Sequence, residues 1–179
     1  MTGRQRLLLV AVLLTTTIGC DQATKHLAKS SLPGTPTQSF LGDTFRLTYA
    51  ENPGAFLSLG AALPEAARFW VLNVGVALVL VALLFHALLG QKVDRSQATA
   101  YALVVGGGLG NWIDRVMRGG TVVDFMNLGV GPVRTGVFNV ADVAIMAGAA
   151  VLLLGGSFRK KPDAAADGSG ASPPPADPA

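Results

Sequence analysis

The sequence predicts a membrane α-helical protein with four transmembrane helices and a small extracytoplasmic β-containing cradle from the first loop. Three observations support this fold class. Half of the 179 residues are hydrophobic and 14% are charged, whereas a soluble domain carries about 25% charged residues. Four stretches approach the roughly 20 apolar residues that a helix needs to cross a bilayer. The long segment between the first two stretches is rich in Pro and Gly, so it is not helical in bulk.

The four predicted helices occupy residues 7–27, 69–89, 98–113 and 137–156. The second is the clearest, because only Asn73 and His86 interrupt its apolar residues. The third is short unless Asp114 and Arg115 are counted with it. Polar residues lie near the ends of the helices, which fits the cost of about 2.5 to 3.5 kcal/mol for a charged side chain at the bilayer centre.

The connections differ in character. Residues 91–95 form a tight polar turn, and residues 28–65 form a long loop in which residues 44–49 alternate with aromatic and β-branched side chains, as short strands do. After Lys161 the chain consists of Pro, Ala, Asp, Gly and Ser without apolar periodicity. We therefore predict one membrane domain, residues 1–158, and a disordered tail, residues 159–179.

The distribution of basic residues predicts the orientation. Four crossings place both termini on one side and both long connections on the other. The short segments of the first side hold Arg4, Arg6, Lys92, Arg95 and the run 159–161. Since basic residues are enriched in cytoplasmic loops, we expect both termini in the cytoplasm.

Polar clusters then gather at the extracytoplasmic face. Three of them are on helices, where a spacing of three or four residues places side chains on one face. These are the pair Asp21 and Lys25, the set Asn111, Asp114 and Arg115, and the pair Asn139 and Asp142. The loop residues Asn52 and Asp124 are expected on the same side. We interpret Asp21 and Lys25 as a buried pair that holds helices together, and Asp124 and Asp142 as functional groups.

Several functional classes find no support in the sequence. The single cysteine, Cys20, excludes an intrachain disulfide and a cysteine-based zinc cage, and no His-x-x-x-His pair offers metal ligands. Residues 106–110 are glycine-rich but lack the Lys-Ser/Thr of a nucleotide loop, so close helix packing explains them better. Basic residues form no stripe with interleaved aromatics, and nucleic-acid binding is not expected. No cofactor is predicted.

Acid–base chemistry by Asp124 and Asp142 remains the best interpretation. Two carboxylates that share a site resist double ionisation, so one keeps a proton while the other is a base. Together they can activate a water and protonate a carbonyl oxygen. Which Asp holds the proton stays open. An alternative is a small ion or proton conductor that uses the two acids as relay groups. A further alternative is that the N-terminus is itself a lipoprotein signal peptide ending at Cys20.

Five ordered motifs resemble the lipoprotein signal peptidase (signal peptidase II) family over about residues 5–157. They are Asp21-Gln-Ala-Thr-Lys25, Asn52-Pro-Gly-Ala, Gly107-Gly-Leu-Gly-Asn-Trp-Ile-Asp-Arg115, Val122-Val-Asp-Phe125 and Phe138-Asn-Val-Ala-Asp142. The resemblance implies a bacterial inner-membrane aspartic endopeptidase that removes signal peptides from diacylglyceryl-modified prolipoproteins. Its expected partners are these precursors, membrane lipid and globomycin-type inhibitors, and we expect a monomer.

The resemblance also implies residue roles. Asp124 and Asp142 match the catalytic pair, and the positions that line the substrate cleft are Asn52, Asn111, Arg115 and Asn139. Supporting roles fall to Asp21, Lys25, Gly54 and Asp114, and Asp114 is expected to position Arg115. One departure concerns Phe56 and Leu57, where the family has a small residue and then an aromatic one.

Overall fold

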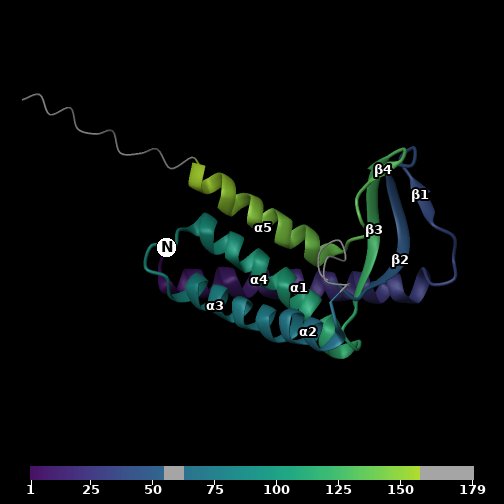
Figure 1. The fold of residues 1–179 in the computed structure, drawn as a ribbon. Coiled ribbons are helices and arrows are strands. Elements are labelled where there is room, and N and C mark those ends of the chain that lie inside the picture. The colour runs from purple at the N-terminus through teal and green to yellow at the C-terminus, as the bar shows by residue number, and fades with distance from the viewer. Residues whose placement is uncertain (55–62, 158–179) are drawn as a thin grey trace, which may run out of the picture.

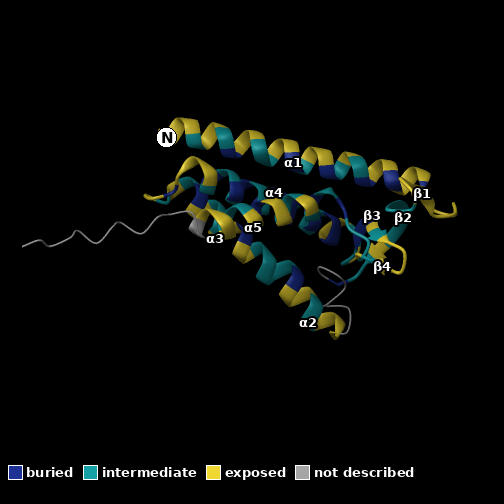
Figure 2. Cartoon of the chain, turned by 90° about the horizontal axis from the view of Figure 1, so that it is seen from above, coloured by how far each residue is buried: buried dark blue, intermediate teal, exposed yellow. Residues whose placement is uncertain are grey.

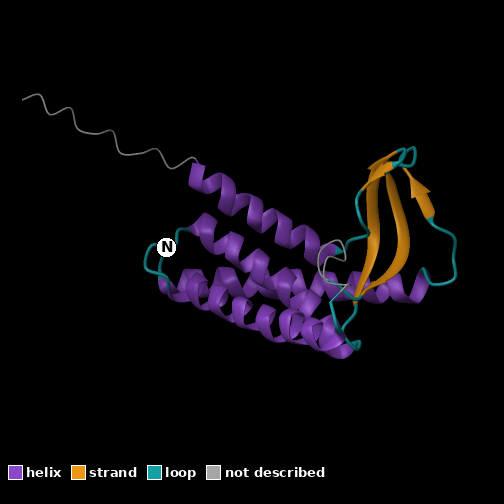
Figure 3. Ribbon diagram, in the orientation of Figure 1, coloured by secondary structure: helices purple, strands orange, loops and turns teal. Residues whose placement is uncertain are grey.

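A bundle of helices with a four-stranded sheet at one end makes up the fold in the computed structural model (Figures 1 and 3). The structure describes residues 1–54 and 63–157. The predicted tail and the departure at Phe56 and Leu57 lie outside these residues. The helices are α1 (Gly3–Ser31), α2 (Glu65–Phe69), the π-helix η2 (Trp70–Gly75), α3 (Val76–Leu89), α4 (Arg95–Met117) and α5 (Val140–Ser157). The strands are β1 (Gln38–Phe40), β2 (Phe45–Asn52), β3 (Val122–Val130) and β4 (Val133–Arg134).

All four predicted helical regions are helical, with shifted ends. Capping boxes start α1 at Thr2 and α4 at Asp94, where the cap side chain accepts a hydrogen bond from the backbone three residues later. Both helices therefore begin before their apolar residues do. The second region runs through α2, η2 and α3. The fourth helix starts at Val140 rather than at residue 137, because Phe138 pairs with Met126 of β3.

The surface of the bundle is apolar. Large hydrophobic side chains such as Leu78, Phe85 and Leu153 are more than half exposed, and much of the outer surface of the helices is exposed (Figure 2). Such a surface marks contact with lipid. Among the described residues, two helical stretches can cross a membrane by length and composition, Gly3–Ser31 and Glu65–Leu89, and Val140–Gly155 is a shorter apolar helix. The predicted number of four crossings stays a prediction.

The sheet is antiparallel in the order β1-β2-β3-β4. Its first half confirms the strand predicted within residues 44–49. The prediction that the β-structure comes from the first loop alone is wrong, because β3 and β4 come from the connection before α5. The strand β3 pairs with β2 over Phe45 to Asn52, with a bulge between Leu47 and Ala50. This pairing joins two loops that are far apart in sequence and places Asp124 beside the helices.

The helix α4 contacts α1, α3 and α5, and its glycines permit the close approach. A Cβ atom at Gly107 would overlap the carbonyl oxygen of Ala141 in α5, and a Cβ at Gly110 would lie 2.6 Å from Oδ2 of Asp21 in α1. The prediction that residues 106–110 serve helix packing is therefore confirmed. Glycines at these positions allow α1 and α5 to pack closely against α4.

Candidate active site

Asp124 and Asp142 come together where β3 meets the first turn of α5. Asp124 is 2% exposed, and its carboxylate accepts hydrogen bonds from the side-chain amides of Asn52 (3.0 Å) and Asn139 (2.7 Å). Asp142 accepts from the amide of Asn111 (2.9 Å) and from the backbone N–H of Asn139 (3.1 Å). The structure thus gathers at one point five residues predicted for the site.

Asn139 connects the two acids. Its side chain donates to Asp124, and its backbone N–H donates to Asp142. In addition, its Oδ1 atom accepts from the backbone N–H of Asp142 at 2.9 Å. Asn139 is therefore the N-cap of α5, and Asp142 completes a capping box at the positive end of the helix. The prediction that these two residues share a helix face is wrong, because Asn139 precedes the helix.

The surroundings of Asp124 favour the protonated form of its carboxyl group. Burial raises the pKa of the Asp124 carboxyl to about 6, and the charge of Asp142 acts in the same direction, while the hydrogen bonds from Asn52 and Asn139 oppose the rise. This carboxyl therefore stays protonated over a wider pH range than an exposed aspartate, whose pKa is about 3.9. Such a group, next to a second acid, is suited to proton transfer.

A buried lysine, Lys25, orients a side chain that binds one of the two acids. Lys25 is fully buried, and its Nζ atom lies 2.8 Å from Asp21 and 3.2 Å from Asp114. It also donates to Oδ1 of Asn111 at 2.9 Å. Because Nζ has no acceptor capacity, this bond orients the amide so that its N–H group points to Asp142.

The carboxylates that pair with Lys25 hold further elements in place. Asp21 accepts from the backbone N–H of Ala141 at 2.9 Å, which fixes the start of α5. Asp114 accepts from the backbone N–H of Val123 at 3.1 Å, which fixes β3 next to Asp124. Gln22 adds hydrogen bonds to Asp114 and to the carbonyl of Gly110. This agrees with the interpretation of Asp21 and Lys25 as a structural pair.

Arg115 lies on another side of α4. Its guanidinium donates to the carbonyl of Gly54 at 3.1 Å and to that of Asn111 at 3.4 Å. The backbone N–H of Gly54 in turn donates to the side chain of Asn52 at 3.0 Å. Asp114 makes no hydrogen bond to Arg115, so the expectation that it positions the arginine is wrong. Backbone carbonyls do so instead.

Three groups that form hydrogen bonds in the site were not predicted from the sequence. Gln22 sits inside the first motif but reads as an ordinary polar residue, and the N–H groups of Val123 and Ala141 carry no signal in the side-chain sequence. Gly110 could be recognised from the sequence, since a glycine within a membrane helix indicates that another helix packs closely against it. Its particular neighbour, the Asp21 carboxylate, follows only from the packing of α1 on α4.

The comparisons with known proteins agree with this geometry. Residues 13–158 match the family described as Signal peptidase (SPase) II. A lipoprotein signal peptidase of Trichormus variabilis is 38% identical over 143 residues, which cover 80% of this chain and 85% of the relative. One of Photorhabdus laumondii is 35% identical over 158 residues, which cover 86% and 87%.

Solved structures share the fold. Two structures of bacterial membrane enzymes superpose with TM-scores of 0.70 and 0.71 at 24% and 22% sequence identity. The first match covers 85% of this chain and 91% of the other, and the second covers 84% and 94%. Because the family match spans most of the chain and curated relatives exceed a third in identity, this chain belongs to the signal peptidase II family.

Proposed function

We propose that this protein is a membrane aspartic endopeptidase that cleaves signal peptides from diacylglyceryl-modified prolipoproteins, on the N-terminal side of the lipidated cysteine. The relatives bear the name of lipoprotein signal peptidases, and the alternative of an ion or proton conductor finds no support among them. The observation that carries the aspartic type is the pair Asp124 and Asp142, bridged by Asn139.

The proposed reaction uses the one proton that the pair shares. The ionised carboxylate takes a proton from a water while the water oxygen attacks the scissile carbonyl carbon. The protonated carboxyl donates to the carbonyl oxygen, so a neutral tetrahedral intermediate forms. This intermediate collapses when the carboxyl that took the proton from water donates it to the leaving amine nitrogen, while the other carboxylate takes a proton from a hydroxyl of the intermediate. The C–N bond breaks, and the pair returns to its starting state with one proton.

The asparagines give the pair its geometry. Asn52, Asn111 and Asn139 each donate an amide hydrogen to one of the two carboxylates. Carboxylates held in this way need little reorganisation during the reaction. We assign these asparagines to the substrate cleft, with Arg115 beside them, and propose supporting roles for Asp21, Lys25, Gly54 and Asp114.

The test is cleavage by the purified protein. A diacylated precursor should be processed at the bond before the lipidated cysteine, and globomycin should block the reaction. The same precursor without the diacylglyceryl group should remain intact, since the lipid holds the peptide at the depth of the acids. Intact diacylated precursor after incubation with well-folded protein would reject the proposed function.

Removal of the Asn52 amide should shift the pH dependence. The hydrogen bond from Asn52 favours the ionised form of Asp124, so Asn52→Ala raises the pKa of this carboxyl above about 6. A pair that must keep one proton loses activity as the pH rises through that pKa. The alkaline limb of kcat/KM against pH is expected to move to higher pH in the variant, while the maximal rate falls.

The control for this profile is Asn127→Ala. Asn127 belongs to the same sheet but donates to the carbonyl of Thr135, so its loss should leave the alkaline limb in place. An unchanged limb in Asn52→Ala, or one at lower pH, would contradict the proposed role of the Asp124 proton.

We further propose four crossings of the bacterial inner membrane, with both termini in the cytoplasm, the acids at the extracytoplasmic face and the tail 159–179 outside the folded domain. A reporter enzyme fused after Lys161 should then be located in the cytoplasm, and the same reporter inserted after Gly131, in the turn between β3 and β4, should be extracytoplasmic. Reporter activity outside the membrane for the Lys161 fusion would overturn this topology.

A further inference from the structure

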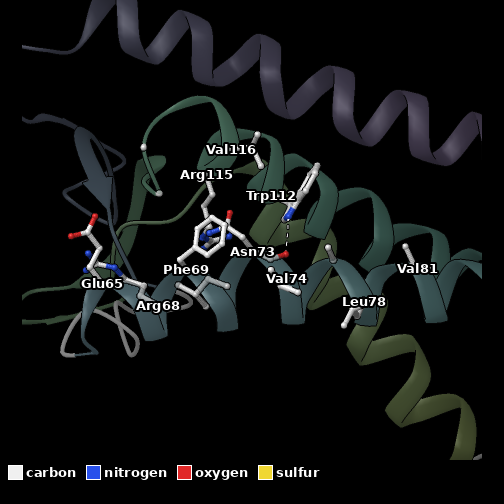
Figure 4. A pocket seen from close by; sticks show the side chains of 14 residues that line it. Glu65, Arg68, Phe69, Asn73, Val74, Leu78, Val81, Trp112, Arg115 and Val116 are labelled. Carbon is white, nitrogen blue, oxygen red and sulfur yellow. Dashed lines mark hydrogen bonds between the residues drawn. The ribbon is translucent and has the colours of Figure 1, made fainter.

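A cavity lies beside the active site, between α2–η2–α3 and the end of α4 that is next to the sheet (Figure 4). It has a volume of about 700 Å³. Most of its lining is apolar, from Phe69, Leu72, Ala77, Leu78, Val81 and Val116. Phe69, Leu78 and Val116 are more than half exposed, so the cavity is a groove that opens onto the surface assigned to lipid.

The charged and amide side chains that line the groove are those of Glu65, Arg68, Asn73 and Arg115. Asn73 and Arg115 lie on the helices η2 and α4. The Nε atom of Arg115 is buried and has no hydrogen-bond partner among the described residues, and the whole residue is 8% exposed. Asn73, which interrupts the apolar second helix, also lines the groove, and its side-chain amide makes no hydrogen bond to the residues that the structure describes. A buried donor is normally satisfied, so the Nε–H group of Arg115 indicates a ligand with acceptor atoms. The amide of Asn73, which is partly exposed, is available to the same ligand.

The backbone around Asn73 is shaped for this position. Asn73 lies within the π-helix η2, and π-helical turns occur frequently at functional sites. Its carbonyl oxygen accepts a hydrogen bond from the indole N–H of Trp112 at 3.0 Å, which fixes η2 against α4 (Figure 4). Asn73 and Arg115 therefore line the groove from two helices that are held together.

The groove is connected to the two acids through Arg115. The guanidinium donates to the carbonyls of Asn111 and Gly54. The Asn111 amide binds Asp142, and the turn at Gly54 is bonded to Asn52, which binds Asp124. Arg115 is thus linked to Asp142 through one residue, Asn111, and to Asp124 through two, Gly54 and Asn52.

We propose that this groove binds one acyl chain of the diacylglyceryl group on the substrate cysteine, and that Arg115 Nε–H and the Asn73 amide donate to its ester oxygens. Ester carbonyls are neutral acceptors, which suit donors that lie among apolar side chains. The chain itself gains from burial of its methylene groups. This inference rests on the proposed function, because the precursor supplies the lipid next to the scissile bond.

The first test compares two alanines of α3. Ala77 lines the groove and Ala82 is exposed and does not. Ala77→Phe should raise KM for a precursor with long acyl chains by about tenfold, the loss expected when two methylene groups leave an apolar site. Its kcat should change little, and Ala82→Phe should match the wild type. Equal KM values for the two variants would overturn the proposal.

Acyl-chain length separates the apolar contact from the polar one. For a precursor with diacetylglyceryl in place of the long chains, Ala77→Phe should behave as the wild type, because no chain reaches residue 77. Asn73→Leu should raise KM for both precursors, since both carry the esters. A diacetylglyceryl precursor that responds to Ala77→Phe as strongly as the long-chain precursor would contradict an acyl site.

Photo-cross-linking locates the chain without turnover. A precursor with a diazirine in one acyl chain, bound to Asp124→Asn, should label residues 74–81 or 112–116, and excess unlabelled diacylated precursor should suppress the label. Label confined to α5, or label that this competitor does not reduce, would overturn the proposal, the latter by identifying bulk phospholipid as the occupant. Failure of the wild type to cleave any diacylated precursor would instead reject the proposed function.

Discussion

Asp124→Asn and Asp142→Asn are each expected to lower the rate of precursor cleavage by a factor of about 10⁴ or more, as removal of one member of a catalytic unit does. An amide can neither take a proton from the attacking water nor give an acidic proton to the carbonyl oxygen. Because both changes keep the shape of the side chain, the variants should still insert and fold. Single-turnover cleavage of a diacylated precursor measures the loss.

A third aspartate provides the matched control. Asp43 lies at the far end of the sheet, where it is 42% exposed and pairs with Arg46 and Arg134. Its backbone has a φ of 69°, a conformation that asparagine tolerates. Asp43→Asn should therefore cleave at the wild-type rate. Cleavage near that rate by either of the other two variants would refute the catalytic pair.

The two acids could be predicted from the sequence because placing a carboxylate near the membrane costs free energy. A carboxylate beside a membrane helix needs a function or a partner, and the topology placed Asp124 and Asp142 on one side. The partners of the acids could not be predicted in the same way. Asn139 can bridge the two acids only because α5 starts at Val140, which makes Asn139 the residue before the helix. The pattern of apolar residues does not define a helix end to within one or two residues.

The position of Asp114 shows a second limit. Its neighbour Arg115 was the expected partner, but adjacent residues of a helix do not face each other. Asp114 therefore faces α1, where it meets Lys25, while Arg115 faces the loop at Gly54. Side-chain direction, rather than distance along the chain, selects the partner.

The strand β3 was missed for a related reason. Residues 122–130 contain Asp124, Asn127 and Gly129 among apolar residues, so they read as a connection. Their pairing with β2 joins segments separated by more than one helix, and such non-local contacts have no signature in a local pattern. The expected β-structure was therefore half complete, and the missing half contains Asp124, which we propose to be catalytic.

The largest effect on stability is expected from Lys25→Met. The side chain of Lys25 is fully buried between Asp21 and Asp114. Among the described residues, its removal leaves the buried Asp21 carboxylate without a cation, and Asp114 keeps only Arg118 at 3.3 Å. Loss of one partner from a buried ion pair costs about 3 to 5 kcal/mol. We expect a lower thermal unfolding midpoint in detergent. We also expect a lower cleavage rate, because Oδ1 of Asn111 loses one of the two donors that orient its amide towards Asp142, and only Asn139 remains.

Lys29→Met is the matched control for this prediction. Lys29 lies one turn further along α1, where it is exposed, so the same substitution should leave the unfolding midpoint close to that of the wild type. A second substitution tests the cause. Adding Asp21→Asn to Lys25→Met removes the carboxylate charge that is left without a cation and should restore part of the lost stability, although Asp21→Asn alone disturbs the network. A double variant less stable than Lys25→Met would show that packing, rather than buried charge, makes Lys25 necessary.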